Sequence, residues 1–196
     1  MVQGIGYKGS EYPTAIGKIH LREYSLWGGM LLRCIKKYWD KYPTYNGVTC
    51  SDNFKSYSFF YEWCQTQKGF NSKDINGKSW QLDKDLLIKG NKLYSENTCV
   101  FVPLRINQLL VKRTNHRGEH PIGVKMCSDK KSFEASCSIT TNKRQYLGHF
   151  KTAYDAFQAY KAFKEGLIKE VANEYKEMLD YRAYEALMNY QVEITD

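Results

Sequence analysis

Cysteine and histidine side chains are the residues of this sequence best suited to hold a transition metal or to act as nucleophiles. The six cysteines are widely scattered without a Cys-x-x-Cys pair, and the four histidines supply no obvious partner for them. A structural zinc site needs four such ligands, commonly in closely spaced pairs. We therefore expect no structural zinc, and we expect free thiols in partly buried positions at Cys34, Cys50, Cys64, Cys99, Cys127 and Cys137.

The cationic side chains indicate a different chemistry, the binding of a polyanion. The formal net charge is +8, and residues 105–150 hold 9 Lys and Arg against 3 acids, whereas residues 151–196 hold 6 against 9. Each phosphate neutralised by a cation releases counterions, so this distribution favours nucleic acid over an anionic membrane as the partner.

No run of about 18 apolar residues is present that would span a bilayer. The first residues also lack the apolar core of a signal peptide. We expect a cytoplasmic protein with no membrane partner.

Apolar spacing predicts the elements of the first half of the chain. The first 20 residues, rich in Gly and Tyr, are expected to form a loosely packed arm. A helix is predicted from Tyr24 to the Tyr42-Pro43 step, because Pro disfavours a helical predecessor. A second amphipathic helix is predicted from Phe54 to Gln65.

Two short apolar stretches then surround a polar bend. Gln81 to Ile88 and Cys99 to Val102 are predicted strands, and residues 89–92 form the loop between them. Ile106, Leu109 and Leu110 continue at helical spacing. This order predicts a strand, a loop, a second strand and a helix.

The last third alternates in a way typical of a small antiparallel sheet. Strands are predicted over 122–124, 133–139 and 146–150, with turns at 129–131 and 141–143. Thr152 is the predicted N-cap of a long helix that covers the sheet, and a further helix is expected over 175–188 with Tyr181, Tyr184, Leu187 and Met188 as its apolar face.

The segment from Leu82 to Asn107 resembles the beta-beta-alpha metal finger, or His-Me finger, of the HNH homing-type endonucleases that phages and group I introns encode. In that family a first strand ends in Asn/Asp-His, a Gly-Asn-Lys-like loop and a second strand follow, and a helix presents a final Asn. The matching positions here are Leu82 to Asp85, Gly90 to Lys92, Thr98 to Pro103 and Asn107. Segments around Trp27 and Trp63 extend the resemblance to about residues 24–110.

The finger resemblance implies metal-assisted hydrolysis of a phosphodiester bond. In such sites one divalent ion contacts the scissile phosphate while a base activates water. Asp carboxylate and Asn amide oxygens suit Mg²⁺ or Mn²⁺. The implied metal ligands are Asp83 and Asn107, and the implied catalytic residues are Asp83, Asp85 and Asn91.

This chain departs from the family at one position, because Asp83 aligns best with the general-base His. If Asp83 binds the metal, then Asp85 is the base or water activation rests on the metal alone; if Asp83 is the base, the metal loses a ligand. Each residue also has a purely structural explanation. Asp83 and Asp85 would be solvent-facing strand residues, Asn91 a turn residue and Asn107 a helix cap.

Residues 121–165 resemble an AP2 domain. The motifs that carry this resemblance are Ile122-Gly123-Val124, Phe133 to Cys137, Lys143 to Phe150 and the Ala-rich helix after Thr152. In the Tyr-Leu-Gly-x-Phe-x-Thr run, Leu147 and Phe150 can pack beneath the helix, and Gly148 permits close backbone approach.

The AP2 resemblance implies a sheet that lies in the major groove of duplex DNA. Arg144 is the expected reader of a base edge because a guanidinium binds guanine bidentately, whereas turn lysines contact phosphates. The expected DNA-binding residues are Lys125, Lys130, Lys131, Lys143 and Arg144. Ordinary solvated turn charges are the alternative explanation.

We therefore predict an α+β chain with a beta-beta-alpha finger core and flanking helices, followed by a three-stranded antiparallel sheet plus helix. The expected parts are an N-terminal arm (1–23), an HNH-like nuclease domain (24–111), a linker (112–120), an AP2-like DNA-binding domain (121–165) and a C-terminal helical extension (166–196). The acidic extension either packs on the core or forms a homodimer interface.

Three functions stay open. The first is a metal-dependent DNA endonuclease of the phage HNH type, nicking or cutting both strands in the cytoplasm of a host cell. The second is a catalytically degenerate DNA-binding or regulatory phage protein, because Asp83 replaces the family His. The third is an inhibitor of a host protein, because the sequence has 16 Tyr and Tyr is enriched in interfaces.

Overall fold

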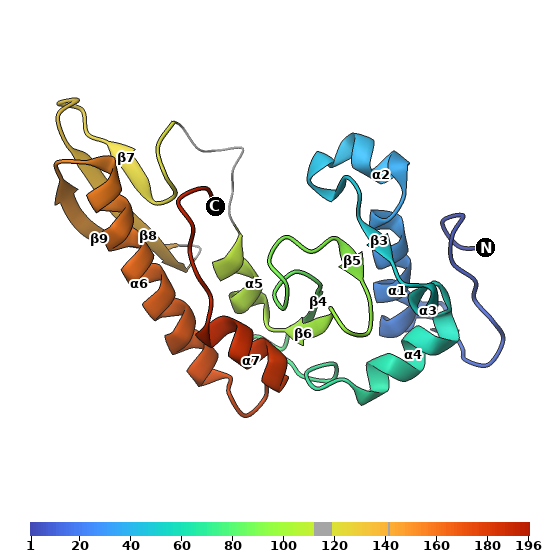
Figure 1. The fold of residues 1–196 in the computed structure, drawn as a ribbon. Coiled ribbons are helices and arrows are strands. Elements are labelled where there is room, and N and C mark those ends of the chain that lie inside the picture. The colour runs from blue at the N-terminus through green and yellow to red at the C-terminus, as the bar shows by residue number, and fades with distance from the viewer. Residues whose placement is uncertain (112–118, 141) are drawn as a thin grey trace. The chain divides into compact units, whose positions relative to one another are not determined.

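The computed structural model describes residues 1–111, 119–140 and 142–196 of the chain, which form a mixed α+β fold (Figure 1). The fold divides into two compact units, an N-terminal unit, Met1–Pro103 with Met178–Ala183, and a C-terminal unit, Leu104–Glu177 with Tyr184–Asp196. Residues 112–118 of the expected linker lie outside the described residues. In the described ranges, no helix combines the length and the apolar character needed to cross a bilayer.

The helices of the N-terminal unit are shorter than the sequence predicts. Their bounds are α1 Arg22–Arg33, α2 Lys36–Lys41, η1 Pro43–Tyr45, α3 Asp52–Lys55 and α4 Tyr57–Thr66. The helix predicted from Tyr24 breaks at Ile35, whose backbone is extended, and Trp39 Nε1 donates to the Arg33 carbonyl at 2.8 Å across the break. The helix predicted from Phe54 breaks at Ser56, because its hydroxyl accepts the Phe59 N–H at 3.3 Å and caps α4.

Three short strand pairs complete this unit. They are the antiparallel β1 Ala15–Ile16 with β2 Ile19–His20, the parallel β3 Thr49–Cys50 with β5 Leu93–Tyr94, and the antiparallel β4 Gln81–Asp83 with β6 Val100–Val102. The strand predicted to reach Ile88 ends at Asp83, because the Asp83 carboxylate binds the next backbone N–H groups and turns the chain.

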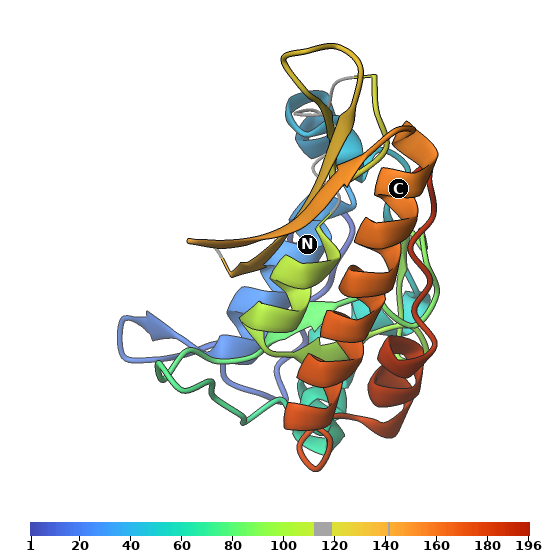
Figure 2. The same cartoon turned by 90° about the vertical axis from the view of Figure 1, so that its left-hand side faces the viewer.

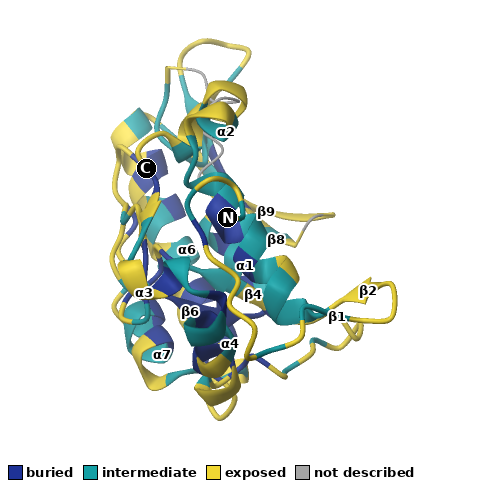
Figure 3. Ribbon diagram, turned by 90° about the vertical axis from the view of Figure 1, so that its right-hand side faces the viewer, coloured by how far each residue is buried: buried dark blue, intermediate teal, exposed yellow. Residues whose placement is uncertain are grey.

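The N-terminal segment, expected to be loosely packed, is tied to the start of α4. The Tyr7 N–H donates to the Lys55 carbonyl and the Tyr57 N–H donates to the Tyr7 carbonyl, each at 3.0 Å. Figure 3 shows that β2 nevertheless remains exposed, and Ile16 of β1 is exposed too.

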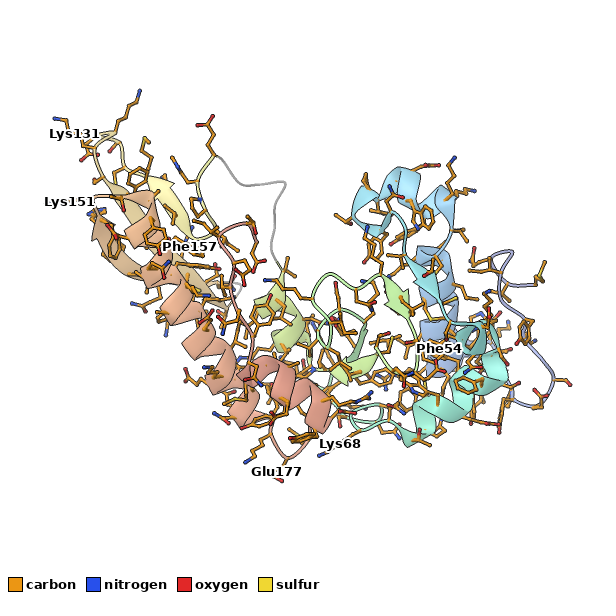
Figure 4. All side chains as sticks on the ribbon, in the orientation of Figure 1. Phe54, Lys68, Lys131, Lys151, Phe157 and Glu177 are labelled. Carbon is orange, nitrogen blue, oxygen red and sulfur yellow. The ribbon has the colours of Figure 1, made fainter. Side chains whose placement is uncertain are left out.

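Aromatic side chains form the core of the N-terminal unit. Trp27, Phe54 and Phe60 are fully buried, and Trp27 Nε1 donates to the Phe54 carbonyl at 2.8 Å. The Trp63 ring centroid lies 4.9 Å from that of Phe54 and 5.7 Å from that of Phe101 on β6. Phe54 is labelled within this cluster in Figure 4. The core therefore links α1, α3, α4 and the β4–β6 pair.

The C-terminal unit contains the predicted sheet and helix. Its elements are α5 Leu104–Leu110, β7 Val124–Met126, β8 Phe133–Thr140, β9 Lys143–Phe150 and α6 Ala153–Glu174. The strands form one antiparallel sheet in the order β7-β8-β9, which confirms the predicted arrangement. Thr152 is the N-cap, as predicted, because its hydroxyl accepts the Asp155 N–H at 3.1 Å. Residue 141 of the second predicted turn lies outside the described residues.

Helix α6 covers one face of this sheet, as Figures 1 and 2 show. The buried residues of that layer include Ala135 and Cys137 on β8, and Ala156, Phe157 and Tyr160 on α6. These small and aromatic side chains let the helix lie close to the strands. Among the described residues of the C-terminal unit, α6 is the helix that packs on all three strands, and it does so from one side of the sheet, so we call the other side the uncovered face.

The last helix, α7 Tyr181–Met188, begins later than the sequence predicts. Helix α6 ends at Glu174, and Asp180 Oδ1 accepts the Arg182 N–H at 2.8 Å where the next helix starts. Tyr181, predicted on the apolar face, is 73% exposed, whereas Leu179 and Ala183 are buried.

All six cysteines are free, as predicted. Cys64, Cys99 and Cys137 are buried rather than partly buried.

Candidate metal finger and nucleic-acid interface

Asp83 lies at the end of β4, opposite Val100 of β6. Its Oδ1 accepts the N–H groups of Asp85 at 3.0 Å and Leu86 at 2.7 Å, and within the described part of the chain no hydrogen bond reaches Oδ2. Burial raises the pKa of Asp83, and the neighbouring Asp85 carboxylate raises it further. The ionised side chain would therefore be stabilised by a cation at Oδ2.

Lys84 partly compensates the charge of this loop. It is only 9% exposed, its Nζ lies 3.4 Å from Asp85 Oδ2, and it donates to the Asn91 carbonyl at 2.8 Å. Asp85 itself is about half exposed. A residue buried as deeply as Lys84 needs such partners, so the ion pair belongs to the architecture of the loop.

The Asn91 amide is used by the backbone of the same loop. Its Nδ2 donates to the carbonyls of Lys84 at 2.6 Å and Leu93 at 2.7 Å, and its Oδ1 accepts the Leu93 N–H at 3.1 Å. These bonds close the loop between β4 and β5. Asn91 thus has a structural role here, and its predicted catalytic role is not needed to explain its position.

Asn107, the other expected metal ligand, lies on α5. Asp83 belongs to the N-terminal unit and Asn107 to the C-terminal unit, so their pairing stays a prediction. Among the residues that the structure describes, no group of three or more His, Cys, Asp or Glu side chains could hold a metal. Asp83 Oδ2 is the oxygen of the loop that fits a hard divalent ion, whose remaining ligands would be amide oxygen and water.

The uncovered face of the β7–β9 sheet gathers a second set of candidate residues. Side chains alternate between the faces of a strand, and cross-strand partners share a face. Because Ala135 and Cys137 face α6, strand alternation assigns the intervening Glu134, Ser136 and Ser138 to the uncovered face, where Ser138 is exposed but Ser136 is buried. The partners that share this face with them are Lys125 and His149 beside Glu134, Tyr146 beside Ser136, and Arg144 beside Ser138.

The other predicted DNA-binding lysines lie at the ends of the sheet. Lys130 and Lys131 occupy the β7–β8 turn, where Asp129 Oδ1 accepts the Lys131 N–H at 2.9 Å. This backbone hydrogen bond is the main cause of the lowered pKa of Asp129. Figure 4 shows Lys131 projecting from the tip of this turn. Lys143 begins β9 opposite Thr140 and is exposed.

A β-bulge places two residues on this face that the sequence did not reveal as candidates. Tyr146 pairs with Ser136 but Gly148 pairs with Ala135, so Leu147 is the extra residue, and Gly148 has φ +125°. As a result Tyr146 and His149 lie on one side, with ring centroids 5.6 Å apart and planes at 81°. Tyr146 is 52% exposed. Their spacing of three residues would place them on opposite faces of a regular strand.

A scan against models of protein families, a search of curated proteins and a search of solved structures each found no match to this chain.

Proposed function

We propose that this chain binds duplex DNA and cleaves it as a metal-dependent endonuclease of the phage HNH type, in the cytoplasm of a host cell. The observation that carries the proposal is the uncovered face of the β7–β9 sheet, which gathers Lys125, Arg144, Tyr146 and His149 opposite α6. This grouping of cations and aromatic rings on one surface is the chemistry that a nucleic-acid interface requires.

The sheet supports DNA binding through two kinds of contact. Arg144 lies near one end of β9, and its guanidinium can read guanine in the major groove. Lys130 and Lys131, in the turn between β7 and β8, are placed to contact phosphates beside the groove. This division predicts that Arg144 contributes to base preference and that the turn lysines contribute to salt-dependent affinity.

The N-terminal unit supports the nuclease half of the proposal. The antiparallel pairing of β4 with β6, with Asp83 at the end of β4, is the strand pair that the proposed finger requires. A divalent ion bound there would polarise the scissile phosphate and lower the pKa of bound water. Asp83 would hold this ion through Oδ2, while the N–H groups of Asp85 and Leu86 keep its Oδ1 in place.

A DNA-binding regulator with an inactive finger is the second candidate. It is favoured by the ion pair between Lys84 and Asp85, which competes with a metal or a base at that carboxylate. It is also favoured by the histidine positions, because none of His20, His116, His120 and His149 falls within residues 82–107.

Cleavage of supercoiled plasmid with Mg²⁺ or Mn²⁺ separates these two candidates. The wild type is compared with Asp83→Ala and Asn107→Ala, and with Asp52→Ala as a control that removes an exposed carboxylate from α3. Metal-dependent nicking that both finger variants abolish, and that the control retains, supports the endonuclease. Intact DNA binding without cleavage supports the regulator.

Binding of a labelled duplex over a range of salt concentrations tests the sheet itself. Arg144→Ala is expected to weaken affinity about tenfold and to relax base preference, since a good bidentate contact is worth about 1–3 kcal/mol. Affinity for DNA that is absent or independent of salt would contradict the proposal and favour an inhibitor of a host protein.

A further inference from the structure

The segment from Lys36 to Gly47, which follows α1 in the N-terminal unit, is an exposed lobe made of α2, η1 and the turn after them. No residue of α2 or η1 is buried, and Figure 3 shows α2 as exposed or intermediate throughout. The sequence of the lobe is nevertheless rich in aromatic residues, with Tyr38, Trp39, Tyr42 and Tyr45. Packing of a hydrophobic core therefore does not explain these side chains.

Three tyrosine rings of the lobe form a cluster at its surface. The Tyr38 ring centroid lies 4.6 Å from that of Tyr42 and 5.3 Å from that of Tyr45. Tyr42 is 41% exposed, and Lys41 Nζ lies 5.4 Å from the centroid of its ring. The Tyr38 and Tyr42 rings are tilted by 37° to each other, and an exposed ring in contact with a second ring can also stack with another flat group.

The lobe is held in a defined position on α1. Trp39 Nε1 donates to the carbonyl of Arg33 at 2.8 Å, and the guanidinium of Arg33 lies 5.9 Å from the centroid of the Tyr45 ring. Lys92, which directly precedes β5, donates to the Asn46 carbonyl. These contacts fix the rings before any ligand binds, which lowers the entropy cost of binding.

The charge of the lobe is positive and uncompensated by ion pairs. Lys36, Lys37 and Lys41 are exposed, Asp40 is the single acid among residues 36–47, and none of the three lysines forms an ion pair with a described residue. Cations that flank an exposed aromatic cluster suit a ligand that carries both planar rings and negative charge.

We propose that this lobe is a binding site for single-stranded nucleic acid, in which an unpaired base stacks on Tyr42 while Lys36, Lys37 and Lys41 contact phosphates. A single strand is favoured over a duplex because the bases of a duplex already stack on one another and do not offer a free face to Tyr42. Stacking of this kind tolerates any base, so the site would distinguish single-stranded from double-stranded nucleic acid but would not select a base sequence. The site is separate from the β7–β9 sheet and does not depend on the function proposed for it.

The experiment measures binding of the full chain to a fluorescent oligothymidylate and, in parallel, to a labelled duplex. Tyr42→Ala and the triple variant Lys36→Ala, Lys37→Ala, Lys41→Ala are each expected to weaken oligothymidylate binding about tenfold and to leave duplex binding within twofold. Tyr42→Phe keeps the ring and should bind as the wild type does. The matched control is the triple variant Lys68→Ala, Lys73→Ala, Lys78→Ala, which removes the same charge from exposed positions between α4 and β4.

The outcomes separate this proposal from the function of the sheet. Weak duplex binding together with strong, lobe-dependent oligothymidylate binding would support the lobe site and contradict the sheet. Oligothymidylate affinity that the lobe variants leave unchanged, or that the control triple lowers as much as the lobe triple, would overturn the lobe site.

Photocross-linking gives a direct second readout. An oligonucleotide with 5-iodouracil is irradiated with the full chain, which is then digested with trypsin. The expected cross-linked peptide is 42–55, which begins with Tyr42. Cross-links confined to residues 143–151 of the sheet would overturn the proposal.

Discussion

Gly123 lies directly against the ring of Tyr160. A Cβ atom added to Gly123 would lie 2.0 Å from Tyr160 Cδ2, and the φ of Gly123 is +78°. The residue precedes β7, and Tyr160 is buried on α6. Position 123 therefore requires glycine for two reasons: the positive φ, and the close approach of the α6 helix to the sheet.

Gly123→Ala is expected to destabilise the C-terminal unit by about 2–4 kcal/mol, because the strained backbone and the displaced Tyr160 ring both cost free energy. Urea denaturation monitored by circular dichroism measures the change. The control is Gly77→Ala, where φ is +74° but no atom lies within 4 Å of the added Cβ. It should cost about 1 kcal/mol, from the backbone alone. Equal losses in the two variants would contradict the packing argument.

The sequence predicted the C-terminal unit better than the N-terminal unit for a physical reason. In β8, alternation along the strand and the turn residues at Asp129 to Lys131 are local signals, and the cap at Thr152 acts within one helical turn. The predicted helices break at Ile35 and Ser56, where the backbone is extended and side-chain hydrogen bonds replace those of a continuous helix. The spacing of apolar residues carries no information about these hydrogen bonds. The parallel pairing of Thr49 with Leu93 joins residues far apart in sequence and had no local signal.

The candidate sites show the same limit. Lys125 and Arg144 are predicted as DNA contacts from the AP2 resemblance, and register places both on the uncovered face. Tyr146 and His149 could not be assigned to that face, because only the bulge at Leu147 and Gly148 brings them together. The structural explanation of Asn91 as a turn residue was one of the two that the sequence left open, but its partners, two of them backbone carbonyl groups, could not be named from the sequence.

Asn91→Ala is expected to lower the free energy of unfolding by about 1–3 kcal/mol, because the partly buried Lys84 carbonyl and the Leu93 N–H lose the hydrogen bonds that they make to Asn91. The measurement is thermal and urea unfolding alongside plasmid cleavage. Asn76→Ala, in the exposed turn 74–77, serves as the control and should change stability by less than about 0.5 kcal/mol. Loss of cleavage with unchanged stability would instead identify Asn91 as a catalytic residue.

Lys164 gives the C-terminal unit a predictable dependence on pH. Lys164 lies on α6, and its burial lowers its pKa below the ordinary value of 10.5. The nearby Cys137 acts in the opposite direction and raises the pKa of Lys164. Between the folded and the unfolded pKa, the folded chain binds fewer protons than the unfolded chain. Its stability therefore rises with pH through that window, and the charged lysine reduces stability at neutral pH.

Lys164→Met keeps a stem of similar length without the charge, and we expect it to raise the unfolding midpoint at pH 7. The gain should shrink as the pH rises through the window between the lowered folded pKa and 10.5, and it should be smallest above 10.5, where the wild-type lysine is largely neutral in both states. Lys169→Met changes an exposed residue of the same helix and should alter stability by less than about 0.5 kcal/mol at either pH. A gain that is constant with pH would show that packing, and not charge, causes the effect.

The bulge in β9 predicts which residues of the sheet contact DNA beyond the cationic ones. Tyr146→Ala and His149→Ala are each expected to weaken duplex binding about fivefold to tenfold, because the two rings share the uncovered face with Arg144. Gln145→Ala is the matched control, since Gln145 is exposed on the same strand but pairs with Cys137, whose side of the sheet faces α6. Fluorescence anisotropy with one duplex at fixed salt measures all three variants. If Gln145→Ala weakens binding as much as Tyr146→Ala does, the DNA does not lie on the uncovered face. The DNA would then contact the outer edge of β9, which is an edge strand of the sheet.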